Sequence, residues 1–112
     1  MNNLTGKAKE QLNTWYQNNP VHYYEDTPNQ LEFGKLDIRC QWGIIQDWAD
    51  SVGYELSTRW NVSLKLHFAY VRDISYYESR LPWSPHNTRQ EARSAAIEKL
   101  NEIINEAFKQ VN

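Results

Sequence analysis

Hydrophobic residues recur along the first part of the chain with a helical period. Between residues 4 and 18 they form one stripe, made of Leu4, Ala8, Leu12, Trp15 and Tyr16. Spacings of three and four residues predict an amphipathic helix over residues 4–18. We expect it to end at Asn18-Asn19-Pro20, because proline disfavours helical backbone in the residue before it.

A second helical stripe follows after a segment without a period. Residues 20–41 contain two prolines and one glycine, so we predict mostly ordered loop there, with a short strand over residues 36–40 as one alternative. Residues 42–52 are predicted to be helical from the stripe Ile44, Ile45, Trp48, Ala49 and Val52. Gly53 then supplies the left-handed residue that commonly ends a helix.

The period changes to two after Gly53. Apolar and polar residues alternate through Tyr54, Leu56, Thr58 and Trp60, and again through Val62, Leu64, Leu66, Phe68 and Tyr70. This alternation predicts a β-meander over residues 54–81 with those residues on its buried face. We place a tight turn at Arg72-Asp73 and a third strand after it. Pro82, Ser84 and Pro85 are expected to end that strand.

A last helix is predicted over residues 88–110. Thr88 and Glu91 have the spacing of a capping box. In this motif the Thr hydroxyl and the Glu carboxylate accept hydrogen bonds from free backbone N–H groups at the start of the helix. Its apolar face comprises Ala92, Ala95, Ala96, Leu100, Ile103, Ile104, Ala107 and Phe108. Because the small residues come first, the first half of this helix can approach a sheet closely.

These elements predict one α+β domain over residues 1–112. Its order is helix, loop, helix, three strands and helix, which favours a three-stranded antiparallel sheet packed against helices. With 40% hydrophobic and 23% charged residues, the chain has the composition of a folded protein. A net charge of −2 argues against a protein that acts mainly by generic binding to nucleic acid or anionic membranes.

The single cysteine, Cys40, excludes an intramolecular disulfide and a complete cysteine-based zinc site. His22, His67 and His86 show no metal-ligand spacing, so we expect no metal and no cofactor. His67 is expected on the polar face of its strand. The sequence has no catalytic motif, which predicts a protein that is not an enzyme. Without an apolar leader or a membrane span, we expect a cytoplasmic protein with no membrane partner.

Two groups of residues are candidates for binding. Trp60, Tyr76, Tyr77 and Trp83 are explained either as core and rim packing or as a protein-contact or stacking surface. Arg89 and Arg93 lie four residues apart in the first turns of the last helix. They form either an anion site or a pair of solvated or salt-bridged surface charges.

Two resemblances bear on function. Residues 44–100 resemble the double-stranded-RNA-binding domain, in which "IIQDWADSVGYELS" corresponds to its first helix and turn and "TRQEARSAAIEKL" to its last helix. More strongly, "QWGIIQDWADSVGY", the meander and "TRQEARSAAIEKLNEIIN" resemble small uncharacterised phage and prophage proteins. Their layout is similar to that of bacteriophage helix-sheet-helix sandwich domains. This second resemblance implies an accessory protein that binds a host or phage macromolecule.

Two hypotheses follow. The first is a phage or prophage accessory protein that acts by non-enzymatic contact with a protein partner or as a homodimer. The alternative is a nucleic-acid-binding module. The alternative requires the basic residues to gather on one face, namely Arg59, Lys65, Arg72, Arg80, Arg89 and Arg93. The first requires a contiguous exposed apolar and aromatic patch.

Overall fold

The protein folds as three helices and one sheet. The computed structural model describes residues 4–18, 32–75 and 78–111, with no account of the side chains of residues 78, 80–83, 110 and 111. The elements are α1 (Gly6–Asn18), the short 3-10 turn η1 (Phe33–Lys35), α2 (Ile38–Ser51), β1 (Tyr54–Asn61), β2 (Leu66–Asp73), β3 (Glu78–His86) and α3 (Arg89–Val111). The predicted α+β class and element order are therefore confirmed.

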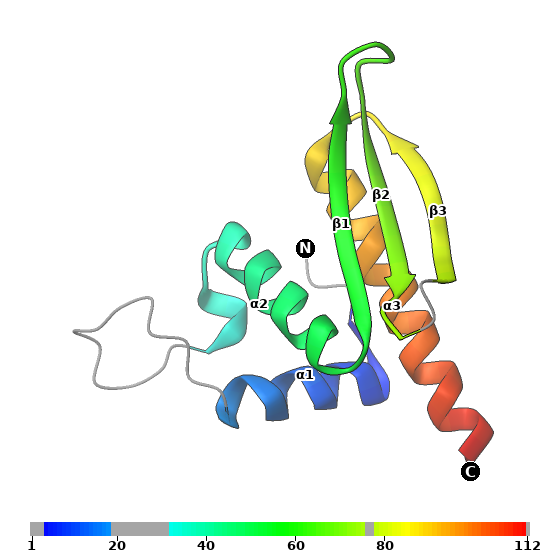
Figure 1. The fold of residues 1–112 in the computed structure, drawn as a ribbon. Helices are drawn as coiled ribbons and strands as arrows, with labels where there is room; N and C mark the ends of the chain where they lie inside the picture. Colours follow the sequence, from blue (N-terminus) through cyan, green and yellow to red (C-terminus); the bar gives the residue numbers. More distant parts are fainter. Residues whose placement is uncertain (1–3, 19–31, 76–77, 112) are drawn as a thin grey trace.

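The strands form an antiparallel meander in the order β1-β2-β3. Figure 1 shows α3 across one face of this sheet, with α1 and α2 beside β1 and below it. Leu56 lies opposite Val71, and Thr58 lies opposite Ala69. Opposite residues share a face of the sheet, and the burial of Leu56, Ala69 and Val71 identifies this face as the one under α3.

The face predicted to be buried is correct for β1 and wrong for β2. The alternation suggested that Leu66, Phe68 and Tyr70 continue the buried face of Leu56. Instead the chain turns over residues 62–65, and the register then pairs even-numbered residues of β1 with odd-numbered residues of β2. Ala69 and Val71 therefore occupy the core, each with 0% exposure, and Leu66, Phe68 and Tyr70 lie on the opposite face.

The ends of β2 and β3 also differ from the prediction. Arg72 and Asp73 pair with β1 as part of β2, and the turn begins at Ile74. The backbone of β3 continues through Pro82 and Pro85 to His86. Proline is tolerated there because β3 is an edge strand, in which an outward-facing N–H needs no partner. The pairing of β3 with β2 shifts register on both sides of Val71.

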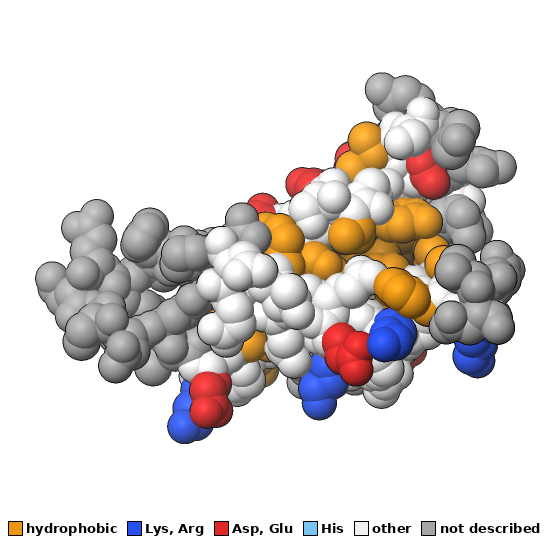
Figure 2. Space-filling model, turned by 90° about the horizontal axis from the view of Figure 1, so that it is seen from below, with side chains coloured by type: hydrophobic (Ala, Val, Ile, Leu, Met, Phe, Trp, Pro, Cys, Tyr) orange, Lys and Arg blue, Asp and Glu red, His pale blue; other side chains and the backbone are white. Residues whose placement is uncertain are grey.

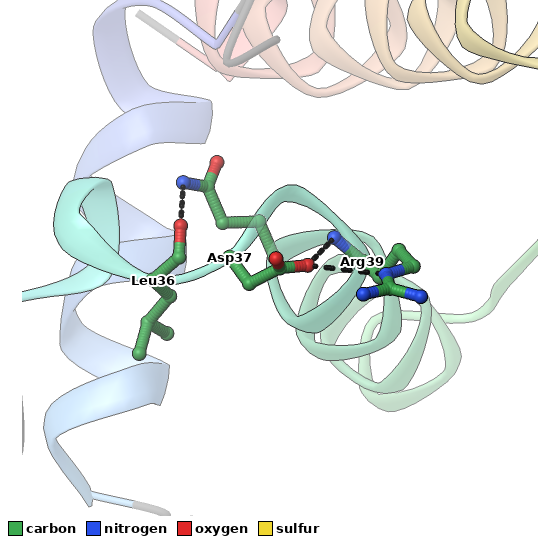
Figure 3. Close-up of polar contacts among 4 residues, drawn as sticks. Leu36, Asp37 and Arg39 are labelled. Carbon is green, nitrogen blue, oxygen red and sulfur yellow. Dashed lines mark hydrogen bonds and ion pairs between the residues drawn. The ribbon is translucent and has the colours of Figure 1, made fainter.

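The start of α2 lies four residues before the predicted one, at Ile38 instead of residue 42. The strand considered over residues 36–40 is therefore wrong. The reason is Asp37, whose carboxylate accepts the N–H of Arg39 at 2.8 Å and so caps the helix. The Gln41 amide also donates to the carbonyl of Leu36 at 2.9 Å (Figure 3).

The core joins the apolar stripes of all three helices to the sheet. The predicted stripes are largely buried, as Leu12, Trp48 and Leu100 illustrate with 0–1% exposure. Two helix-end signals are also confirmed. Gly53 has φ +96° after α2, and the Thr88 hydroxyl accepts the N–H of Glu91 at 3.1 Å before α3.

Candidate functional site

The far end of the β1–β2 hairpin carries the most exposed large hydrophobic side chains of the described residues. We call residues 60–67 the distal hairpin. Val62 is 74% exposed, Leu64 is 61% exposed and Trp60 is 47% exposed. Figure 1 shows this end of the hairpin extending beyond the start of α3. No described helix therefore reaches far enough to bury these side chains.

The turn of the distal hairpin is held by Asn61. Its side-chain oxygen accepts the N–H of Leu64 at 2.9 Å, and its carbonyl accepts the N–H of Lys65 at 2.8 Å. Lys65 adopts φ +55°, in the left-handed region. These bonds fix the backbone of the turn, so Val62 and Leu64 are presented to solvent by a defined conformation.

Trp60 is the only residue of the predicted aromatic set whose side chain the structure describes. Its ring packs on His67 with centroids 4.7 Å apart and an angle of 48°. His67 therefore makes a cross-strand contact, but its predicted place on the polar face is wrong. It shares the face of Ala69, because the turn reverses the parity of β2.

The other members of the aromatic set stay predictions. Tyr76 and Tyr77 lie outside the described residues. Trp83 belongs to the backbone of β3, but its side chain lies outside the description. On the same face as Trp60 and His67, the strand β3 contributes His86, which lies opposite His67 and contacts the Ser84 hydroxyl at 2.6 Å.

A polar cluster occupies the sheet face away from α3. The Glu55 carboxylate accepts a hydrogen bond from the Tyr70 hydroxyl and another from Arg72 at 2.8 Å. The hydrogen bond from Tyr70, followed by the bond and charge of Arg72, lowers the pKa of Glu55 despite partial burial. Burial, followed by the Glu55 carboxylate, raises the pKa of Tyr70. This cluster pairs its charges internally.

Arginines gather where α2 and α3 begin. Arg93 places its guanidinium 5.4 Å from the centre of the buried Trp42 ring, in a cation–π arrangement. Arg39 lies one helical turn before Trp42, and Arg89 lies one turn before Arg93. We call Arg39, Arg89 and Arg93 the arginine cluster. Burial, followed by repulsion from Arg89 and Arg39, lowers the pKa of Arg93.

Only part of the arginine cluster was identified from the sequence. Arg89 and Arg93 follow from their helical spacing, whereas Arg39 and Trp42 belong to a different helix and their proximity depends on packing. A salt bridge was one of the alternatives that the sequence left open for Arg93. Among the described residues Arg93 has no ion-pair partner, and the Trp42 ring occupies that place.

The basic residues considered for nucleic-acid binding lie in separate places. Arg59 and Arg72 are on the sheet face away from α3, and Lys65 is in the distal hairpin. Arg89 and Arg93 belong to α3 on the other side of the sheet (Figure 1). The side chain of Arg80 is outside the description. The five described residues therefore do not form one basic face.

A groove of about 510 Å³ lies between α1, the end of α2 and the end of α3. Its apolar lining includes Trp15, Trp48, Val52 and Phe108, and its rim includes Lys7. Figure 2, which views the molecule from this side, shows hydrophobic side chains exposed along a hollow. The sequence did not indicate this groove, because three separate elements supply its lining.

Within residues 4–18, 32–75 and 78–111, no three acidic, histidine or cysteine side chains are arranged to hold a metal ion. Asp47 and Asp50 of α2 are both exposed. Over the same residues, none of the helices combines the length and the apolar composition that crossing a bilayer requires.

Neither a scan against protein-family models nor searches of curated proteins and of solved structures found a match to this chain.

Proposed function

We propose that this chain is a non-enzymatic protein–protein interaction module of the phage or prophage accessory type, and that it contacts its partner through the distal hairpin. The observation that carries the proposal is the exposure of Val62 and Leu64 at 74% and 61% on a projecting, hydrogen-bonded turn. Exposed apolar side chains that gather on one protrusion are typical of contact sites, because their burial against a partner is favourable. Trp60 beside them is of the residue type most often dominant in protein interfaces.

The edge of β1 adds a second means of contact. The carbonyls of Gly53 and Asn61 accept N–H groups of Ile74 and Lys65, so the backbone N–H and C=O groups of odd-numbered β1 residues face β2. The backbone groups of the even-numbered residues face the open edge of the sheet. There the Gln46 side chain of α2 donates to the carbonyl of Leu56 at 3.1 Å. Thr58 and Trp60 therefore offer edge groups to which a strand of a partner, or of a second copy, can pair.

The distribution of charge favours this proposal over the nucleic-acid alternative. Binding to a polyanion depends on several cations that follow one path on the surface. Here the described members of the predicted basic set are divided between two sides of the sheet and the distal hairpin, and Arg72 is neutralised by Glu55. The net charge of −2 also opposes attraction to a polyanion.

A photocrosslinking amino acid at position 62 tests the proposal. We expect position 62 to form an adduct with one defined protein, or with a second copy, in lysate treated with nuclease. The same probe at position 9, an exposed site on α1, is the control. Adduct formation from position 62 should fall strongly in the variant Leu64→Ser. The matched control is Ile74→Ser, which removes an exposed apolar side chain elsewhere.

Two results contradict the proposal. One is equal crosslinking from positions 62 and 9, which shows that the distal hairpin has no preferred partner. The other is an adduct that disappears with nuclease, which favours nucleic acid. Leu64→Ser should keep the wild-type free energy of unfolding within about 0.5 kcal/mol, because the replaced side chain is 61% exposed, and Ile74→Ser, at a side chain 36% exposed, should stay folded. Loss of the adduct then reports on contact and not on folding.

A further inference from the structure

The arginine cluster holds more positive charge than the neighbouring described residues neutralise. Arg39 contacts the Asp37 carboxylate at 3.4 Å, but that carboxylate also accepts the backbone N–H of Arg39 as the helix cap (Figure 3). Neither Arg89 nor Arg93 has an ion-pair partner in the part of the chain that the structure describes. Three guanidinium groups are thus served by one exposed carboxylate.

Arg93 is also incompletely satisfied in its hydrogen bonding. Its Nε is buried and has no acceptor among the described residues. A buried donor without an acceptor costs roughly 1–3 kcal/mol in general. The Arg93 guanidinium packs on the Trp42 ring, with its Cζ atom 5.4 Å from the ring centre. The cluster is therefore a partly buried cation with two further cations beside it, and the described residues supply no counter-charge to Arg89 or Arg93.

We propose that the arginine cluster binds a phosphoryl group. Guanidinium groups bind phosphate through paired N–H donors, and Arg is preferred to Lys where that geometry matters. A phosphate monoester brings up to two negative charges and three terminal oxygens, which suits three guanidinium groups from two helices. A carboxylate brings one charge and two oxygens, and it leaves part of the cluster unpaired.

The ligand is expected to be a single phosphoryl group on a small molecule or a protein side chain. Among the remaining described basic residues, Arg59 and Arg72 lie on the other side of the sheet and Lys65 lies in the distal hairpin. The lysines at positions 7, 35, 99 and 109 each pair with a neighbouring glutamate, so no row of unpaired cations leads from the cluster along a polynucleotide. This site is independent of the proposed hairpin contact, because the two use different residues.

Inorganic phosphate is the first probe. Its binding is monitored by NMR of labelled protein at constant ionic strength. We expect saturable shifts of the Arg93 Nε–H signal and of the Arg89 backbone amide, whereas acetate at the same concentration produces weaker shifts without saturation. Phosphoserine and a short single-stranded oligonucleotide are then compared with inorganic phosphate. Tighter binding of phosphoserine indicates a phosphoryl monoester, and much tighter binding of the oligonucleotide contradicts the single-phosphoryl proposal.

Two variants of equal charge change make the test specific. Arg89→Gln should weaken phosphate binding by about tenfold, because one charged hydrogen-bonding group is lost. Lys109→Gln, near the other end of α3, should leave it unchanged. Arg93→Lys keeps the charge but removes the planar fork, so it should also weaken binding. Equal affinity in Arg89→Gln and Lys109→Gln, with both folded by their amide spectra, overturns the proposal. A variant with Val62→Ser and Leu64→Ser should bind phosphate normally, which separates this test from that of the hairpin contact.

Discussion

Glu55 links two residues of the neighbouring strand. Its carboxylate accepts hydrogen bonds from the Tyr70 hydroxyl and from Arg72, and the Arg72 guanidinium lies 5.8 Å from the centre of the Tyr70 ring. Glu55 lies directly opposite Arg72, so the register of β1 and β2 brings the two side chains together on one face. The sequence predicted both strands, but it placed Tyr70 on the wrong face and therefore did not indicate this contact.

Glu55 should make stability depend on pH. Its pKa is lowered in the folded state, so its contribution is fully present above the unfolded pKa and is lost as pH falls through the folded pKa. We expect Glu55→Gln to lower the free energy of unfolding near neutral pH by no more than about 1 kcal/mol, since both partners are over a third exposed. The deficit should shrink below about pH 4, as Glu titrates.

Urea unfolding of wild type and Glu55→Gln at a series of pH values measures this effect. Tyr70→Phe retains the carboxylate and removes one of its hydrogen bonds, so its deficit should also shrink in acid. A deficit of Glu55→Gln that stays constant from neutral to acidic pH shows that ionisation of Glu55 does not contribute.

At the scale of elements, α1 is attached to α3 by two asparagines. Asn105 accepts the N–H of Ala8 at 3.0 Å and donates to the carbonyl of Thr5 at 3.1 Å. Asn101 accepts the N–H of Thr5 at 2.8 Å. Free N–H groups at the start of a helix are usually capped by a nearby residue, whereas here the cap comes from a helix almost a hundred residues later. Gly6 fits this contact, because it adopts φ +57° and a Cβ there would lie 3.2 Å from Asn105 Oδ1.

Asn105→Ala should therefore destabilise the protein by roughly 1–3 kcal/mol, because it leaves the N–H of Ala8 without its acceptor and removes one of two donors to the carbonyl of Thr5, which keeps the N–H of Lys9. The matched control is Asn13→Ala, which removes an exposed amide from α1 itself and should have little effect. Chemical denaturation measures both. If the two variants are equally stable, the cap from α3 does not hold α1 in place.

At the scale of the whole molecule, the distance between α3 and the sheet depends on small residues. Ala69 of β2 and Ala92 and Ala96 of α3 each have 0% exposure and belong to one core. Without larger side chains between them, α3 can lie close to β2. Larger residues such as Leu100 and Ile104 follow toward the end of α3, where α1 joins the core. The order of small and large residues in the sequence predicted this arrangement.

Ala96→Leu should test this close packing. We expect it to lower the free energy of unfolding by about 1–3 kcal/mol, because the added carbons find no space between α3 and the core around it. Ala107→Leu, at an exposed position of the same helix, is the control and should be nearly neutral. A thermal unfolding midpoint for Ala96→Leu at or above that of the control contradicts tight packing at this interface.

The candidate sites were partly indicated by the sequence. Trp60, Arg89 and Arg93 were identified because residue type and spacing mark them. Val62 and Leu64 were placed on a buried strand face, although they form the exposed turn. Arg39 and Trp42 were missed because they meet Arg93 only when α2 packs beside α3.

By itself, the sequence determined the class of the fold, the order of its elements and most of their buried stripes. Those features depend on periodicity and on local signals such as Thr88 and Gly53, which act through neighbouring residues. The tertiary structure alone decided which face of β2 is buried, since this depends on where the chain turns within an unbroken alternation. It also decided the capping of α1 by Asn105 and the pairing of Arg93 with Trp42. Contacts between residues distant in the sequence exist only after the elements have packed, so no local pattern records them.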